Sequence, residues 1–147
     1  MVLFLYRHHE EEMKIHHIGY LVKDLLEAEK QFLLLGYKRE TECVYDAARD
    51  ADICFYVNGE YRIELVAPKS SDSVVYGLLK KYKNTPYHIC YYSEDLEKDI
   101  EILRDSGFWQ IDEPKEAVAI DSKRVVFLLS NQSGMIELVE DKGEKKD

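Results

Sequence analysis

The sequence has little of what cross-links or breaks a polypeptide chain: its 147 residues include three cysteines, three prolines and seven glycines. So few prolines and glycines exclude collagen-like and low-complexity classes. The thiols of Cys43, Cys54 and Cys90 match no metal-binding pair spacing. An odd, sparse count is typical of reduced cysteines in the cytoplasm. We therefore expect one cytoplasmic globular domain that needs no disulfide bonds.

Long hydrophobic runs and excess positive charge are also missing. No apolar run approaches the roughly 20 residues that span a bilayer. The apolar start at residues 1–6 is short and meets a charged stretch, unlike a signal peptide. The formal net charge of −9 disfavours nucleic acids and anionic membranes, which attract cationic surfaces. A small-molecule substrate, with no nucleic-acid or membrane partner, is the expectation.

What the chain does contain is a repeat of itself. His17-Ile18-Gly19-Tyr20 recurs as His88-Ile89-Cys90-Tyr91, an offset of 88 − 17 = 71. Ile63-Glu64-Leu65-Val66 recurs as Ile136-Glu137-Leu138-Val139, an offset of 136 − 63 = 73. Such repetition indicates an internal duplication, whose halves pack about a pseudo-twofold axis. The repeat begins near Met13, so residues 1–12 are predicted to be an appendage, 13–140 the domain, and 141–147 a mobile, mostly charged tail.

Each half has the pattern of a strand, a helix and then three strands. Asp24 and Asp95 are suited to begin the two helices, and Gly36 and Gly107 to end them. This order predicts an α+β fold built of two βαβββ modules, 13–68 and 86–140, joined by a linking helix at 70–84. The predicted strands are 15–22, 42–45, 53–57 and 61–67 in the first half, and 87–92, 108–111, 124–129 and 135–139 in the second.

Each half also carries one histidine and one glutamate at matching strand positions. Glu64 and Glu137 lie between apolar residues, so if the apolar side chains face the helices, the carboxylates face the other side of the sheet. A single strand histidine or glutamate is more often structural or solvated. Four symmetric positions, His17, Glu64, His88 and Glu137, together indicate a site for a divalent ion such as Zn²⁺, Ni²⁺, Co²⁺ or Mn²⁺. By the same alternation, His16 is expected on the opposite face.

The His-Ile-Gly opening, the Ile-Glu-Leu-Val closure and the duplication over residues 14–140 resemble the vicinal oxygen chelate superfamily. That group includes glyoxalase I, methylmalonyl-CoA epimerase, extradiol dioxygenases and bleomycin-resistance proteins. Residues 61–68, the linking helix and residues 86–90 look most like the epimerase branch. The resemblance implies an open, cup-shaped, mostly antiparallel eight-stranded sheet around the metal, with His17, Glu64, His88 and Glu137 as ligands. It also implies a homodimer.

The chemistry that this resemblance implies is proton transfer next to a metal-bound carbonyl. A divalent ion polarises a carbonyl or thioester oxygen and so acidifies the adjacent C–H. Glu137 is the expected base, with Glu64 serving the opposite face. We expect a metal-dependent isomerase acting on an acyl-CoA thioester, methylmalonyl-CoA above others. A glyoxalase I-like lyase acting on a hemithioacetal, or a non-catalytic binding or resistance protein, are the alternatives.

One departure concerns the stretch around Arg49. The epimerase branch usually carries an extra glutamate there, whereas residues 46–50 contain none. Asp46 or Asp50 takes its place, or the reaction differs. Pocket walls are expected from the loops 46–52 and 113–123. Arg49, Lys123 and Arg124 are the candidates for binding an anionic substrate.

Overall fold

The computed structural model describes residues 12–143, so most of the predicted appendage and tail lies outside the described residues. The first half contains β1 (Ile15–Leu21), α1 (Leu25–Leu34), β2 (Lys38–Arg39), β3 (Val44–Asp46), β4 (Ala51–Asn58) and β5 (Tyr61–Pro68). After α2 (Tyr76–Tyr82), the second half contains β6 (Thr85–Ser93), α3 (Leu96–Asp105), β7 (Trp109–Gln110), β8 (Lys115–Ala117), a 3₁₀ helix (Val118–Ile120), β9 (Lys123–Ser130) and β10 (Gly134–Glu140).

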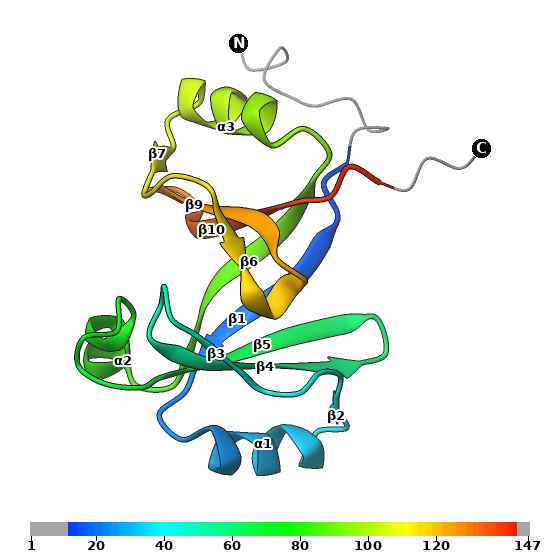
Figure 1. Cartoon of the computed structure of the whole chain (residues 1–147), viewed down its shortest axis with the longest axis vertical. Helices are drawn as coiled ribbons and strands as arrows, with labels where there is room; N and C mark the ends of the chain where they lie inside the picture. The colour runs from blue at the N-terminus through cyan, green and yellow to red at the C-terminus, as the bar shows by residue number, and fades with distance from the viewer. Residues whose placement is uncertain (1–11, 144–147) are drawn as a thin grey trace.

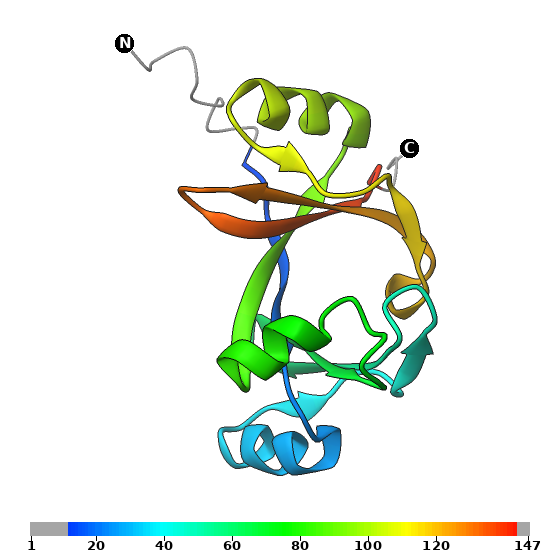
Figure 2. The ribbon, with the colours of Figure 1, turned by 90° about the vertical axis from the view of Figure 1, so that its left-hand side faces the viewer.

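The strands form one open, mixed sheet in the order β2-β4-β5-β1-β6-β10-β9-β7, with β3 added beside β4 and β8 beside β9. The pairs β1–β5 and β6–β10 are parallel, and the others are antiparallel. Figure 1 shows the two modules as lobes, each backed by its own helix. In Figure 2, β1 and β6 run side by side between the lobes. The predicted α+β fold with an open sheet is confirmed.

The helices begin where their capping residues predict. The side chain of Asp24 accepts a hydrogen bond from the backbone of Glu27, and Asp95 caps α3 in the same way through Lys98. Gly36 and Gly107, just beyond the helix ends, have φ angles of +99° and +101°. Because these angles strain any residue with a Cβ, glycine is favoured there.

Helix packing decides which way the strand residues face. Ile63 and Leu65 of β5 pack in the cluster beneath α1, and Ile136 and Leu138 of β10 pack against α3. Since side chains alternate along a strand, the residues between them face the concave side of the sheet. The expectation that the helices and the glutamates lie on opposite faces is therefore confirmed.

Three short elements differ from the sequence-based expectation. Strands β2 and β8 were not predicted, because two or three residues are too few to show an alternating pattern. The linking helix α2 begins only at Tyr76. Ser73 precedes it in a turn, and its hydroxyl donates to the backbone carbonyl of Arg49. Among the described residues, no helix is long and apolar enough to cross a bilayer.

Candidate metal centre

The four predicted ligands converge at the middle of the sheet. They come from its four central strands, β1, β5, β6 and β10. Nε2 of His88 lies 3.0 Å from Oε1 of Glu137, and Nε2 of His17 lies 3.2 Å from the same oxygen. Oε1 of Glu64 lies 3.4 Å from Nε2 of His17 and 3.6 Å from Nε2 of His88. One ligand atom from each residue can be chosen so that all four lie within 4.8 Å of one another.

Strand pairing explains the convergence. Gly19 of β1 lies opposite His88 of β6, and His17 lies opposite Cys90, across the junction between the two modules. A Cβ atom on Gly19 would overlap the imidazole ring of His88. The lack of a side chain at Gly19 thus leaves the space that the His88 ring occupies.

The residues of this cluster fit a divalent cation. Glu64 and Glu137 are completely buried, yet none of their carboxylate oxygens accepts a hydrogen bond from any residue between 12 and 143. If both imidazoles are neutral, the net charge of this region is −3 + 1 = −2. The negative charges are the carboxylates of Asp46, Glu64 and Glu137, and the positive charge is the guanidinium of Arg49. Burying such charge is expensive unless a cation compensates it. Two nitrogen and two oxygen donors suit first-row ions that accept imidazole and carboxylate together.

Electrostatic interactions within this cluster couple His17 to the two glutamates. Burial lowers the pKa of His17, but the carboxylates of Glu64 and Glu137 outweigh burial and raise it to about 9. Burial raises the pKa of Glu64, but the charges of Arg49 and His17 lower it to about 2. Burial also lowers the pKa of His88. A divalent ion held here would need a neutral imidazole at His17, so its binding would release a proton from that residue.

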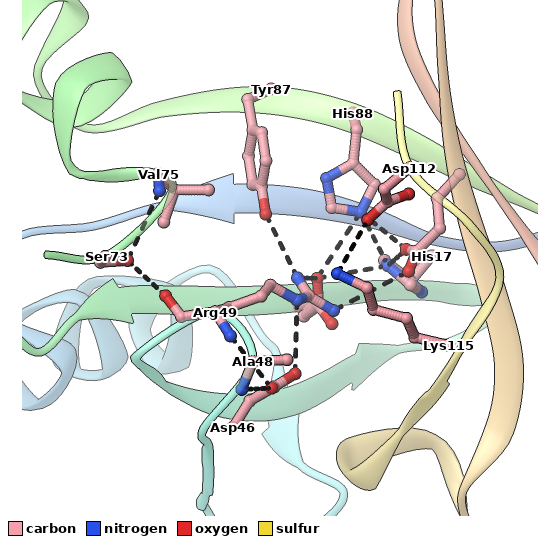
Figure 3. Close-up of polar contacts among 12 residues, drawn as sticks. His17, Asp46, Ala48, Arg49, Ser73, Val75, Tyr87, His88, Asp112 and Lys115 are labelled. Carbon is pink, nitrogen blue, oxygen red and sulfur yellow. Dashed lines mark hydrogen bonds and ion pairs between the residues drawn. The ribbon is translucent and has the colours of Figure 1, made fainter. Parts of the chain in front are cut away.

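Arg49, predicted to contact substrate, reaches the cluster from the loop between β3 and β4. Its side chain is buried, with Nη1 3.5 Å from Oε1 of Glu64 and Nη2 3.8 Å from Oε2 of Glu137. Nε of Arg49 lies 3.4 Å from Oδ2 of Asp46, and the other carboxylate oxygen, Oδ1, accepts a hydrogen bond from the Arg49 backbone. Figure 3 shows the guanidinium between Tyr87 above and Asp46 below.

The other predicted contacts lie elsewhere. The carboxylate of Asp50 accepts hydrogen bonds from the hydroxyl groups of Tyr45 and Ser70 instead of facing the cluster. Arg124 already pairs with Glu140 and Glu97. Lys123 begins β9, and neither it nor Arg124 lines the cavity described next. The substrate-binding roles of Lys123 and Arg124 remain predictions.

A cavity of about 330 Å³ adjoins the cluster. Its walls include residues of both loops expected from the sequence. Three residues lie between the cavity and the cluster, since each lines the cavity and also contacts a cluster residue: Arg49, Tyr87 and Phe127. The positions of Tyr87 and Phe127 at the cluster could not be predicted from the sequence, since tyrosine and phenylalanine in strands are usually packing residues. The lining residues are Asp46, Ala48, Arg49, Val74, Val75, Leu78, Tyr87, Ile111, Asp112, Lys115, Glu116, Ala117, Val125, Phe127 and Met135.

The expectation for His16 is wrong. Its Nδ1 lies 2.7 Å from Nδ1 of His17, so His16 contacts a cluster residue. The pairing of β1 with β6 shifts register between Ile15 and His17, which breaks the alternation at His16. Because Nε2 of His17 faces the cluster, its Nδ1–H is free to donate to His16. A metal-binding histidine is commonly oriented by such a bond from its other nitrogen.

We expect His16→Phe to weaken metal binding about 10–100-fold, the usual effect of losing a partner of a ligating histidine. Phenylalanine keeps a ring against Phe55 and Tyr92 but cannot accept the hydrogen bond. Competition with a chromophoric chelator measures the affinity. His16→Gln, which retains an acceptor, should bind metal more tightly than His16→Phe. Equal affinity of His16→Phe and wild type would show that the bond does not orient His17.

Comparison with known proteins agrees with this geometry. The model of the Glyoxalase/Bleomycin resistance protein/Dioxygenase superfamily matches residues 16–127, most of the chain. The chain belongs to this superfamily. The superfamily predicted from the repeat and the four ligand positions is thereby confirmed.

Relatives of this superfamily member extend over nearly its whole length. The uncharacterized protein YqjC of Bacillus subtilis (strain 168) is 25% identical over 138 residues, 90% of this chain and 95% of that protein. The structure of hypothetical protein BH1468 from Bacillus halodurans C-125 is similar with a TM-score of 0.81 at 23% identity, covering 93% of this chain and all of that one. A methylmalonyl-CoA epimerase in complex with methylmalonyl-CoA and NH₄⁺ is similar with a TM-score of 0.74 at 25% identity, covering 88% of this chain and 94% of that one.

Proposed function

We propose that this superfamily member is a divalent-metal-dependent isomerase or lyase that moves a proton at a carbon next to a carbonyl. Its favoured activity is that of a methylmalonyl-CoA epimerase. The observation that carries the proposal is the convergence of His17, Glu64, His88 and Glu137 beside a cavity large enough for a short acyl group. Similarity to the epimerase that binds methylmalonyl-CoA supports the substrate assignment.

The proposed roles of the side chains follow from their positions. When bound, a divalent ion would supply polarisation of the substrate carbonyl, which acidifies the neighbouring C–H. Glu137 is assigned as the base, as the family resemblance implies. Like that of Glu64, its carboxylate accepts no hydrogen bond from a described residue. Glu64 comes from the other module and serves the opposite face of the carbon. Because its carboxylate is ionised, the proton that it passes to the carbon has to come from solvent. Two carboxylates that act on opposite faces of one carbon invert its configuration.

A glyoxalase I-like lyase is the second candidate. It is favoured by Arg49, whose guanidinium cannot act as a proton acceptor where the epimerase branch usually carries a glutamate. Asp46 cannot readily replace that base, because it accepts backbone hydrogen bonds from Ala48 and Arg49 and pairs with the guanidinium. A non-catalytic binding protein of this fold is the third candidate. For the enzyme we propose a homodimer, since Leu26 and Leu34 of α1 are exposed. We also propose a cytoplasmic location, which the free thiols of the three cysteines favour.

Two measurements test the proposal. Protein purified without added metal should contain one first-row divalent ion per chain by mass spectrometry. In D₂O, the metal-loaded protein should then introduce deuterium at the α-carbon of methylmalonyl-CoA. No deuterium exchange, together with turnover of the methylglyoxal–thiol adduct, would identify the lyase. Wild-type protein that retains no ion and turns over neither compound would leave only binding.

A further inference from the structure

The wall between the cavity and the metal cluster carries two side chains that can donate hydrogen bonds to one ligand. Arg49 is 8% exposed, and its Nη1 donates to the Tyr87 hydroxyl over 3.4 Å. Both residues line the cavity. Figure 3 shows the tyrosine ring descending from β6 so that its hydroxyl meets the guanidinium.

Several contacts hold the guanidinium in this orientation. Asp46 pairs with Nε and accepts a hydrogen bond from the Arg49 backbone, while Ser73 donates to the Arg49 carbonyl. The carbon of the guanidinium lies 5.4 Å from the centroid of the Phe127 ring. Because backbone and side chain are both fixed, Arg49 loses little further freedom when it binds a ligand.

The pair retains unused donors. Nη2 of Arg49 is buried and makes no hydrogen bond with any described residue. The Tyr87 hydroxyl accepts from Arg49, so its own proton is available to a ligand. A buried donor without an acceptor is costly, so the site favours a ligand that supplies oxygen acceptors.

The two glutamates do not fully use the guanidinium. Its nitrogens lie 3.5 Å from Glu64 and 3.8 Å from Glu137. A well-formed arginine–carboxylate pair has distances of about 2.7–2.9 Å and two parallel bonds. Both carboxylates are instead nearer to the imidazoles. Arg49 thus still has the geometry to bind another carboxylate.

We propose that Arg49 and Tyr87 form a carboxylate-binding subsite, so that the substrate carries an ionised carboxylate close to the carbon at which the proton moves. This inference rests on the proposed function and narrows its substrate class. The apolar walls of the same cavity, among them Val74, Leu78 and Met135, suit a short acyl chain. A malonate-type monothioester meets both requirements, whereas a neutral hemithioacetal does not use the carboxylate subsite.

Calorimetric titration with malonyl-CoA and propionyl-CoA tests the subsite, because only malonyl-CoA carries the acyl carboxylate. Wild-type protein should bind malonyl-CoA at least about tenfold more tightly, as expected for hydrogen bonds to a charged group. Tyr87→Phe should reduce this preference about fivefold and Arg49→Lys about tenfold, with propionyl-CoA affinity unchanged. Matched controls are Tyr61→Phe, at an exposed tyrosine, and Arg39→Lys, at an arginine paired with Glu29. Both should retain the wild-type preference.

The titrations are repeated after metal removal with a chelator. A preference for malonyl-CoA that persists and depends on Arg49 and Tyr87 supports the subsite. A preference that disappears with the metal, or variants that weaken both ligands equally, would overturn it. The deuterium-exchange assay reports separately on the reaction. If deuterium exchange occurs but the preference for malonyl-CoA does not depend on Arg49, only the subsite is refuted. If the preference is present but no deuterium is exchanged, only the proposed reaction is refuted.

Discussion

Replacing Glu137 with glutamine is expected to abolish metal retention and proton exchange together. The substitution preserves the shape of the side chain but removes the charge that faces His17 and His88. Metal affinity should fall by more than about 100-fold, which is the upper range for residues that only support a ligand. Deuterium exchange into methylmalonyl-CoA should fall about 10²–10⁴-fold, the usual contribution of a general base.

Glu140→Gln is the matched control for this substitution. It lies on the same strand, pairs with Arg124 away from the cluster, and is not a cavity residue. Loss of such a partly exposed pair should change stability little and leave the metal content intact. Metal analysis and exchange rates are measured on both variants. A Glu137→Gln protein with a full complement of metal and wild-type exchange would refute the role given to Glu137.

The second large effect is expected from Gly19→Ala. The added methyl group would meet Cε1, Nδ1 and Nε2 of His88, which is almost wholly buried on the neighbouring strand. Because the two backbones are paired at this position, the imidazole has to turn away. Overpacking of this kind costs about 1–3 kcal/mol of unfolding free energy. Metal binding should be lost as well, because His88 can no longer reach the other ligands.

Gly77→Ala separates this clash from a general effect of removing glycine. Gly77 lies in α2, and a Cβ atom there meets nothing within 4 Å. Alanine in a helix should raise the unfolding free energy by about 0.5–1 kcal/mol and leave metal binding unchanged. Urea denaturation in the presence of a chelator gives the stability of both variants, and competition titration gives the metal affinity. If Gly19→Ala binds metal as tightly as wild type, His88 does not require the space at Gly19.

The local features predicted correctly share a physical origin. Asp24 and Asp95 cap helices through their own side chains, and the apolar neighbours of Glu64 and Glu137 must pack against those helices. Such preferences act over a few residues, so they can be recognised from a short segment of the sequence. Duplication then made a long-range prediction possible, since like modules place like residues near their shared axis.

Features that depend on strand register were not predictable in the same way. His16 contacts His17 only because β1 shifts register against β6. A bulge arises from the pairing of two strands far apart in the chain, so strict alternation placed His16 on the wrong face. The approach of Tyr87 to Arg49 likewise joins β6 to a loop of the other module.

The two-module fold and the four candidate ligands could be predicted from the chain alone, because periodicity, capping and repetition are properties of the chain. The surroundings of those ligands depend on the tertiary structure. It placed Arg49 against the buried carboxylates, gave His88 the space beside Gly19, and brought Tyr87 to the cavity wall. These contacts join residues that are distant in sequence, and their geometry is set by the packing of the two modules, which no local pattern encodes.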